Sequence, residues 1–516
     1  MAKYDEIIVG AGSAGSALAA RLSEDRSRRV LLIEAGPEYL TRDETPEDIR
    51  YGRTMSFIDH DWKFAAEING GRNIRYPRGK VAGGSSAVGA TVALRGVPAD
   101  YDEWAAAGNP AWAWNEVLPY FQRLEDDLDF AGEYHGQGGP FPVRRWRPGE
   151  LTPGSAAFVD ACLAAGFDEV KDHNHPEATG VGPIPSNRRD PQYRATTGTT
   201  YLDMIRGREN LEIWAHTMVD RVVFEGSKAV GVRAACNGGG YELVEGRRVI
   251  LAAGSIASPM ILLRSGIGPA DGLREHGIDS LVDLPGVGAN LIDHERTGAF
   301  MVPKPGAYDP AQAFLQEILR TTAPGSADFN DLQYYMVNYF NLGPFPELQM
   351  LAGAPAILGV MVVSQRPQPR GHLALTSADP AAPPKIDLNF LSDEREMQVL
   401  INGVRQSWEL ANHPGIRDLG ESFVILRESM MDDDEALSFY VKASLDSAYH
   451  PVGTARMGAA GDSGAVVSQR CAVYGTESLY VCDASIMPSI VRANTNVTSI
   501  MIGERAADWL RDSGTV

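Results

Sequence analysis

The sequence predicts an α/β protein built around a discontinuous Rossmann-like domain, and three observations support this fold class. With 516 residues, the chain exceeds what one hydrophobic core usually supports, so we expect two or more domains. A glycine-rich turn joins an apolar run to a helical segment near the N-terminus. Apolar runs typical of buried strands recur in the middle of the chain and near its end.

The segment 4–36 carries the pattern of a dinucleotide site. Residues 7–9 read as a buried strand, and residues 10–15 form G-x-G-x-x-G ahead of a helical stretch. The first glycine permits a tight turn, the second lets the backbone approach a pyrophosphate, and the third lets the helix pack on the strand. Glu34 ends the next predicted strand, where an acid can bind ribose hydroxyls. This pattern favours FAD or NAD over NADP.

Further elements follow in order along the chain. Residues 76–96 are rich in small side chains, which predicts either close backbone contact with a flat ligand or a glycine-rich surface loop. Residues 211–253 read as strands, 258–268 as a short helix closed by glycine, and 479–485 as another buried strand before a C-terminal helix at 499–510. The tyrosines and phenylalanines of 334–345 favour either a substrate wall or ordinary core.

Composition excludes several functions. The net charge of −20, from 67 acidic and 47 basic residues, argues against nucleic acid and anionic membranes as partners. No apolar run approaches the ~20 residues that span a bilayer. The four cysteines form no CxxC pair, which suits a reducing compartment, so we expect a cytoplasmic protein.

The histidines leave two interpretations open at this stage. His450, in "SAYHPVGTARMG", could be a packed side chain or a chemical group. The stretches "DHD" (59–61) and "DHNHP" (172–176) lack the supporting clusters of a metal site, so we expect no metal, and His294 in "DHE" reads as structural. The absence of G-x-S-x-G gives no support to a serine hydrolase.

Six blocks of the chain, taken together, resemble one enzyme family. They are "VGAGSAGSALAARLSED", "YPRGKVAGGSSAVGATVALRG", "AAGSIASPMILLRSGIGP", "LPGVGANLIDH", "YHPVGTARMG" and "LYVCDASIMPSIVRANTNVTSIMIGERAAD". In this order, and over nearly the whole chain, they are similar to the glucose-methanol-choline (GMC) oxidoreductases, and especially to His/Asn members such as choline oxidase. The resemblance implies FAD rather than NAD.

The resemblance also implies a domain plan and a set of cofactor contacts. We expect an FAD-binding domain formed by 1–100, 191–300 and 440–516, and a substrate-binding domain formed by 101–190 and 301–439 on an antiparallel sheet with helices. Matching positions imply FAD contacts at Gly10, Gly12, Ser13, Ala14, Gly15, Glu34, Ala35, Arg78, Gly84, Ser85, Val219, Ala253, Asp483, Ala484, Asn494, Thr495, Asn496 and Val497.

The implied catalytic pair is His450 and Asn494. In the family's reaction an alcohol gives a hydride to flavin N5 as its hydroxyl proton leaves, and a neutral imidazole can take that proton. Asparagine can hydrogen-bond the same oxygen without titrating. No histidine follows His450, so the His/His arrangement of other members is not possible here.

The chain departs from the family in one block, and this shapes the expected function. Where Ala-Ile-Asn-Gly-Met is usual, the chain has Ala87-Val88-Gly89-Ala90-Thr91. Val88 stands where some members attach FAD through histidine, so we expect non-covalent FAD, and the small side chains leave room for a bulky substrate. We therefore expect oxidation of an alcohol, a sugar or glycoside hydroxyl or a bulky aryl alcohol, to an aldehyde or ketone. Electrons would pass to oxygen or to another acceptor; the alternative is a hydroxynitrile-lyase-like protein without net redox.

Overall fold

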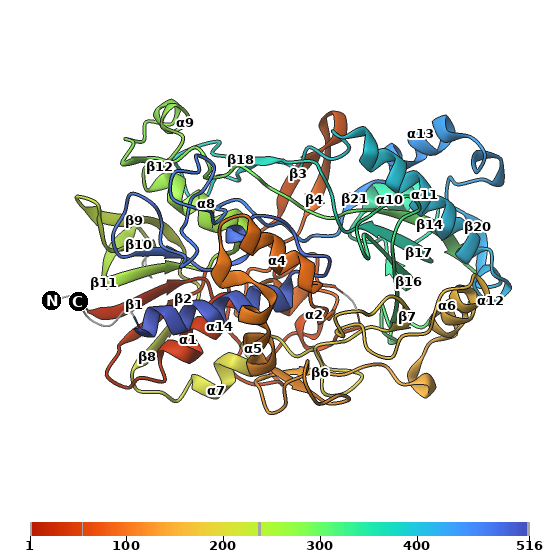
Figure 1. Cartoon of the computed structure of the whole chain (residues 1–516), viewed down its shortest axis with the longest axis horizontal. Coiled ribbons are helices and arrows are strands. Elements are labelled where there is room, and N and C mark those ends of the chain that lie inside the picture. Colours follow the sequence, from red (N-terminus) through yellow and green to blue (C-terminus); the bar gives the residue numbers. More distant parts are fainter. Residues whose placement is uncertain (1–2, 54, 236–238, 513–516) are drawn as a thin grey trace.

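The computed structural model describes residues 3–53, 55–235 and 239–512, and it places two large sheets side by side (Figure 1). Strands of the first sheet come from the beginning, middle and end of the chain, as the three separate apolar runs predicted. The fold class is thus confirmed as α/β with a discontinuous Rossmann-like unit.

The first sheet is parallel at its centre and antiparallel at one side. Its parallel strands, in spatial order, are β8 (Leu211–Trp214), β2 (Val30–Ile33), β1 (Tyr4–Val9), β11 (Tyr241–Leu251) and β22 (Leu479–Val481). The first half of β11 also pairs antiparallel with β10 (Lys228–Ala235), which pairs with β9 (Val219–Glu225). The strands β1 and β2 are buried almost throughout, as expected for strands covered on both faces.

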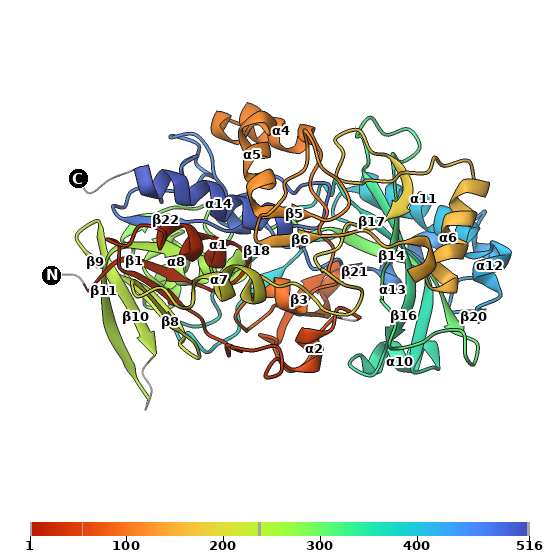
Figure 2. The same ribbon diagram turned by 90° about the horizontal axis from the view of Figure 1, so that it is seen from below.

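Helices α1 (Ser13–Leu22) and α14 (Asn496–Asp512) lie side by side along this sheet in both ribbon views (Figures 1 and 2). A Cβ added to Gly503 would lie 2.4 Å from the carbonyl oxygen of Ala14, so only glycine allows the two helices to approach this closely. Helix α8 (Gly254–Arg264) follows β11 and packs on β9. The predicted C-terminal helix is confirmed and begins three residues earlier than expected.

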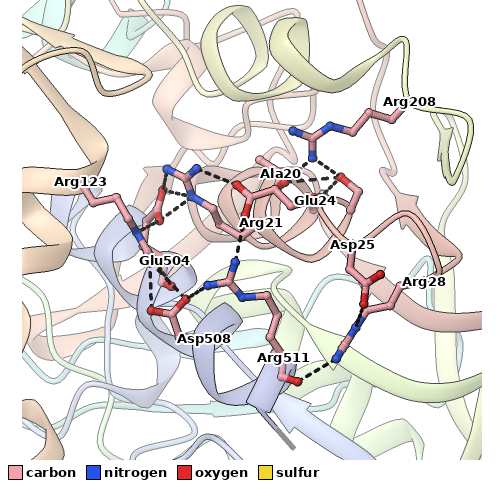
Figure 3. Close-up of polar contacts among 12 residues, drawn as sticks. Ala20, Arg21, Glu24, Asp25, Arg28, Arg123, Arg208, Glu504, Asp508 and Arg511 are labelled. Atoms are coloured by element: carbon pink, nitrogen blue, oxygen red, sulfur yellow. Dashed lines mark hydrogen bonds and ion pairs between the residues drawn. The ribbon is translucent and has the colours of Figure 1, made fainter. Parts of the chain in front are cut away.

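A buried ion-pair cluster joins α1 and α14 (Figure 3). The side chain of Glu504 has no exposed surface and accepts hydrogen bonds from Arg21 Nε at 2.8 Å, Arg123 Nε at 2.7 Å and the Tyr201 hydroxyl at 2.6 Å. These partners come from three separate segments of the chain. The cluster therefore ties the C-terminal helix to the N-terminal half of the molecule.

The second sheet is antiparallel. Its strands, in spatial order, are β20 (Gly420–Phe423), β14 (Glu295–Pro303), β17 (Ala356–Ser364), β16 (Leu332–Asn341), β15 (Glu317–Thr321) and β7 (Gly180–Pro183), and β21 (Asp446–Ser447) also pairs with β14. The helices α11 (Glu394–Ala411), α6 (Pro153–Ala164) and α13 (Asp434–Ser444) pack on it.

Strand register decides which side chains of this sheet meet the helices. Val362 contacts Gly403 of α11, whereas its neighbours Met361 and Val363 point to the opposite face because side chains alternate along a strand. Tyr335 pairs with Met361, and Arg296 pairs with Val363, so these residues share that opposite face. This face is turned toward the first sheet and contributes to the cavity described below.

Smaller elements fill the space around the two sheets. Strands β3 (Phe64–Ile68), β4 (Arg72–Tyr76), β18 (His372–Ala374) and β19 (Lys385–Asp387) form a further sheet, and β5 (Glu125–Asp127) pairs with β6 (Phe141–Val143), as β12 (Ile267–Gly268) does with β13 (Val282–Asp283). The other helices are α2 (Glu47–Arg50), α3 (Ser85–Val88), α4 (Pro98–Ala106), α5 (Trp114–Leu124), α7 (Asp203–Ile205), α9 (Ala270–Glu275), α10 (Pro346–Ala352) and α12 (Pro414–Arg417).

The structure also describes the cysteines and the apolar character of the helices. Cys162, Cys471 and Cys482 are free and buried, and Cys236 lies outside the described residues. Within the described ranges, no helix has both the length and the apolar character needed to cross a membrane.

Candidate active site

A cavity of about 600 Å³ is lined by residues of both sheets and by the glycine-rich segments. It brings together nearly all of the residues that the sequence predicted to contact a cofactor. Those that line it are Gly10, Gly12, Ser13, Ala14, Glu34, Ala35, Arg78, Gly84, Ser85, Val219, Ala253, Asp483, Ala484, Asn494, Thr495 and Asn496. Gly15 and Val497 are not among its lining residues.

The N-terminal glycines form a narrow backbone cradle. Gly10 has a φ of +103°, and a Cβ there would lie 2.6 Å from the carbonyl oxygen of Ala252. A Cβ on Gly84, whose φ is +53°, would lie 2.7 Å from the Cα of Gly12. The segment 76–96 therefore packs directly on the glycine turn, which agrees with the close-contact interpretation and not with a surface loop. Gly15 lies behind the turn and lets α1 approach Gly10.

Glu34 closes one end of the cavity. Its carboxylate accepts hydrogen bonds from the backbone N–H groups of Ala11 at 3.0 Å and Gly36 at 2.8 Å. Burial raises the pKa of Glu34 to about 7, against the opposing effect of those backbone hydrogen bonds. The side chain is thus fixed at the end of β2, on the cavity wall, and its contact with a ribose stays a prediction.

Asp483 and Asn496 connect the C-terminal segment to the cradle. The Asp483 carboxylate accepts hydrogen bonds from the Gly254 N–H at 2.8 Å and from the Ser258 hydroxyl at 2.5 Å. The Ser13 hydroxyl donates to Asn496 Oδ1 at 2.7 Å. Asp483 thus fixes the start of α8, and Asn496 joins the starts of α1 and α14; all three helix starts line the cavity. The positive ends of these helix dipoles favour an anionic pyrophosphate there.

His450 and Asn494 meet on the opposite side of the cavity. Asn494 Nδ2 lies 3.1 Å from His450 Nε2, and the hydroxyl of Tyr335 lies 3.2 Å from Asn494 Oδ1. Because an amide nitrogen only donates, Nε2 of the imidazole accepts, and the imidazole proton resides on Nδ1. The predicted pair is thus within hydrogen-bond distance, and His450 presents an unprotonated nitrogen at the cavity.

A second histidine completes this arrangement. His294 Nδ1 lies 3.0 Å from His450 Nδ1. With the proton on Nδ1 of His450, His294 Nδ1 must accept it, which fixes the tautomer of both rings. Burial lowers the pKa of His294 to about 3, so this ring is neutral near neutral pH. The sequence indicated only a structural role for His294; it contacts the imidazole of His450 directly.

The electrostatic setting of His450 favours its neutral form. Burial is the main cause that lowers its pKa well below the usual value of 6.5, and His294, Arg78 and Arg296 lower it further. The backbone N–H of His450 donates to Asp293 Oδ1 at 2.7 Å, and so does that of His294. Asp293 therefore positions both histidines through their backbones.

The wall beside His450 is mostly apolar and aromatic. The small segment 88–91, the loop 55–57 and one face of the antiparallel sheet form it. Its side chains include Met55, Phe57, Phe64, Val88, Phe314, Leu315, Tyr335, Met361, Val363 and Tyr449. Of the two adjacent tyrosines, Tyr335 lines the cavity, whereas Tyr334 does not and is buried. The loop 55–57 and Phe314 carried no functional signal in the sequence.

Comparison with known proteins gives a consistent result. The N-terminal GMC oxidoreductase model matches residues 4–296, and the C-terminal model matches residues 367–503. The chain is 34% identical to an oxygen-dependent choline dehydrogenase of Brucella anthropi, over 98% of this chain and 95% of that protein. It is also 34% identical to an uncharacterized GMC-type oxidoreductase of Rhodococcus erythropolis, over 98% and 97% of the two chains.

Solved structures agree in fold. Pyridoxine 4-oxidase from Mesorbium loti superposes with a TM-score of 0.90 at 29% identity, covering 99% of this chain and all of the other. A fungal aryl-alcohol oxidase superposes with a TM-score of 0.81 at 23% identity over 98% of both chains, which shows the shared fold alone. With both family models matched and nearly full-length relatives, the chain belongs to the GMC oxidoreductases, a family of FAD-dependent enzymes.

Proposed function

We propose that this protein oxidises a bulky primary aryl alcohol to the aldehyde, with His450 as the base. The observation that carries the proposal is the contact between Asn494 Nδ2 and His450 Nε2, 3.1 Å apart at the cavity wall. An alcohol oxygen placed next to both groups can replace their direct hydrogen bond: it donates its proton to Nε2 and accepts a hydrogen bond from the amide. FAD, when bound, supplies the acceptor of the hydride.

The hydrogen-bonded chain of side chains prepares His450 for this step. The lowered pKa keeps the imidazole of His450 neutral, and the hydrogen bond to His294 keeps the single N–H proton of His450 on Nδ1. When Nε2 takes the alcohol proton, the positive charge that forms on the imidazole is stabilised by the acceptor nitrogen of His294. The amide of Asn494 donates a hydrogen bond to the substrate oxygen and does not titrate during the step.

The same residues support non-covalent FAD binding. The cradle of Gly10, Gly12 and Gly84 suits a pyrophosphate, and Glu34 lies where a ribose hydroxyl can donate to it. Val88, at the position where some family members link FAD through histidine, lines the cavity and has no nucleophilic atom. Denaturation in acid should therefore release all of the flavin into the supernatant.

Replacing Glu34 with alanine should weaken FAD binding by about tenfold or more, because the ribose loses a buried carboxyl acceptor. The dissociation constant can be measured by titrating FAD into the apoprotein and following the quenching of flavin fluorescence. Glu38→Ala, four residues further along the chain and paired with Arg206, serves as a matched control and should bind FAD normally. Equal affinities in both variants would contradict the role of Glu34.

The wall chemistry favours an aryl alcohol over a sugar. A sugar needs many hydrogen-bond partners for its hydroxyls, whereas most side chains beside His450 are apolar or aromatic. Val88, Gly89 and Thr91 line the cavity where the family usually has the larger Ile, Asn and Met, so this part of the wall leaves more room. The choline dehydrogenases and the pyridoxine oxidase among its relatives are named for substrates that carry an alcohol, which supports this reaction class.

A panel of alcohols mixed anaerobically with the FAD-loaded protein tests the proposal. Benzyl-type alcohols should bleach the oxidised flavin band near ~450 nm faster than glucose or methyl glucoside. Such bleaching would also exclude the lyase alternative, which involves no net redox. If sugars bleached the flavin faster than every aryl alcohol, the proposed substrate class would be wrong.

His294→Leu should lower the rate of flavin reduction by about tenfold to a hundredfold, because His450 loses the partner that fixes its tautomer. His294→Asn keeps an acceptor near the Nδ1 position and should restore most of that loss. A structural role alone would predict no such rescue. The rates can be measured in a stopped-flow instrument across pH, and identical profiles for the two variants would contradict the tautomer argument.

A further inference from the structure

Arg296 is a charged residue of the cavity that the proposed reaction does not use. It lies on β14, on the sheet face that also carries Met361 and Val363. Its Nη2 donates to Asp446 at 2.5 Å and to the hydroxyl of Tyr449 at 3.1 Å. The guanidinium also lies 4.8 Å from the centroid of the Tyr449 ring, so this arginine is held next to the residue that precedes His450.

The other end of the guanidinium faces the cavity. Nη1 contacts the thioether sulfur of Met361 at 3.8 Å, and a thioether is a weak acceptor. Asp446, which holds Nη2, is not among the cavity-lining residues. The pair is thus oriented with its cation toward the cavity and its anion behind it. A strong acceptor on a substrate would improve on the Met361 contact.

Among the described residues, this cavity has no unpaired carboxylate that could balance the charge of a cationic substrate. Among the described residues that line it, the acidic side chains are Glu34 and Asp483. Both are already bound by backbone N–H groups, Glu34 at the ribose end and Asp483 beside Gly254. Asp293 is buried behind His450 with its oxygens bonded to Ser447 and to backbone N–H groups. Within the part of the cavity wall that the structure describes, a cation near His450 would therefore meet Arg78 and Arg296 and no unpaired carboxylate.

Aromatic rings can also bind a cation, but two of the rings that line the cavity, Tyr449 and Trp62, already face cations of the protein. Arg296 covers a face of Tyr449, and Lys80 Nζ lies 4.7 Å from the centroid of the Trp62 ring. A trimethylammonium group would compete with these cations and be repelled by them. The positive charges of Arg78 and Arg296 and the occupied faces of the Tyr449 and Trp62 rings therefore both disfavour a cationic substrate.

We infer that Arg296 recognises a carboxylate on the alcohol substrate, so that the preferred substrates are aryl alcohols bearing an acidic group, and that quaternary ammonium alcohols are excluded. This inference rests on the proposed function and names its substrate class. It sets the protein apart from the choline dehydrogenases that it resembles at 34% identity. Nη1 of Arg296 donates to the carboxylate, while His450 and Asn494 bind the hydroxyl.

Flavin reduction by three alcohols tests the inference. The anaerobic second-order rate constant of flavin reduction by 4-(hydroxymethyl)benzoate should exceed that for benzyl alcohol by at least about tenfold, and choline should give no measurable bleaching. Arg296→Met should lower the ratio of the first two values by about tenfold or more. Arg296→Lys keeps the charge and should keep part of the ratio, which separates recognition from loss of folding.

Two further variants make the interpretation specific. Asp446→Asn removes the anion behind Arg296 and should preserve or raise the preference for the carboxylate. Arg395→Met, at a surface pair with Asp393, is the control and should leave the ratio unchanged. Calorimetry should show that benzoate binds to the FAD-loaded protein. The affinity for benzoate should fall in Arg296→Met by the same factor of about ten or more as the substrate ratio.

The possible outcomes are distinct. A ratio near one in the unmodified protein, or the same loss in Asp446→Asn as in Arg296→Met, would overturn the inference and leave the proposed function intact. Reduction by choline at a rate equal to that of the aryl carboxylate would overturn it as well. Failure of every alcohol to bleach the flavin would instead overturn the proposed function together with the inference.

Discussion

His450→Ala should slow flavin reduction by an aryl alcohol by a factor of about 10² to 10⁴, the range that removal of a general base typically costs. The alcohol proton would then have to pass to water in a buried site, where the resulting charge is poorly solvated. FAD binding should persist, since the pyrophosphate cradle and Glu34 lie elsewhere in the cavity. The variant should therefore be yellow, folded and nearly inactive.

Stopped-flow reduction under anaerobic conditions measures this effect, with His372→Ala as a matched control. His372 is half exposed and pairs with Asp387 at 3.8 Å, so its loss should change the rate by less than about twofold. A His450→Ala rate within tenfold of the unmodified rate would show that another group takes the proton.

The pH dependence of the unmodified protein follows from the same group. The base must be neutral, and burial lowers the pKa of His450 well below 6.5. With its pKa lowered, His450 stays neutral to more acidic pH than a free imidazole does. We therefore expect kcat/KM to be level from about pH 7 to 9 and to fall only at acidic pH. An activity that rises steadily through pH 7 to 9 would mean that His450 titrates in that range, contrary to its environment.

Glu504→Ala should lower the free energy of unfolding by about 3 kcal/mol, because it removes the shared partner of Arg21 and Arg123 in a buried cluster. The Tyr201 hydroxyl also loses its acceptor. The damage should extend to the site, since α14 begins at Asn496, two residues after Asn494. We therefore expect weaker FAD retention as well as lower stability.

Urea unfolding followed by circular dichroism gives the stability difference, and Glu24→Ala is the matched control (Figure 3). Glu24 also pairs with Arg21, at 3.0 Å, but its side chain is 38% exposed, so its loss should cost no more than about 0.5 kcal/mol. Equal effects of the two substitutions would show that burial of Glu504 does not matter to the helix pair.

The nucleotide half of the site was predictable because its signals are local. Gly10, Gly12 and Glu34 occur at fixed offsets around one strand–turn–helix unit, and each has a backbone reason for its residue type. His450 and Asn494 were predictable only through the ordered family blocks. Their distance along the chain contains no physical information about contact, and the fold brings them to 3.1 Å.

The substrate half was not predictable, and strand register is the reason. Tyr334 and Tyr335 are adjacent in sequence, yet alternation places one in the core and the other on the cavity. Arg296 is assigned to the cavity only by its pairing with Val363, and His294 contacts His450 only because β14 runs beside the segment that holds it. Such long-range pairings leave no pattern in a single sequence.

A single-turnover experiment tests the account most directly. The FAD-loaded protein is mixed anaerobically with excess 4-(hydroxymethyl)benzoate, and the aldehyde formed is quantified against the flavin absorbance lost. The account predicts complete loss of the band near ~450 nm and about one aldehyde per flavin, with both signals slowed together in His450→Ala. An oxidised flavin that persists with every aryl alcohol, or aldehyde formed without loss of the band, would contradict it.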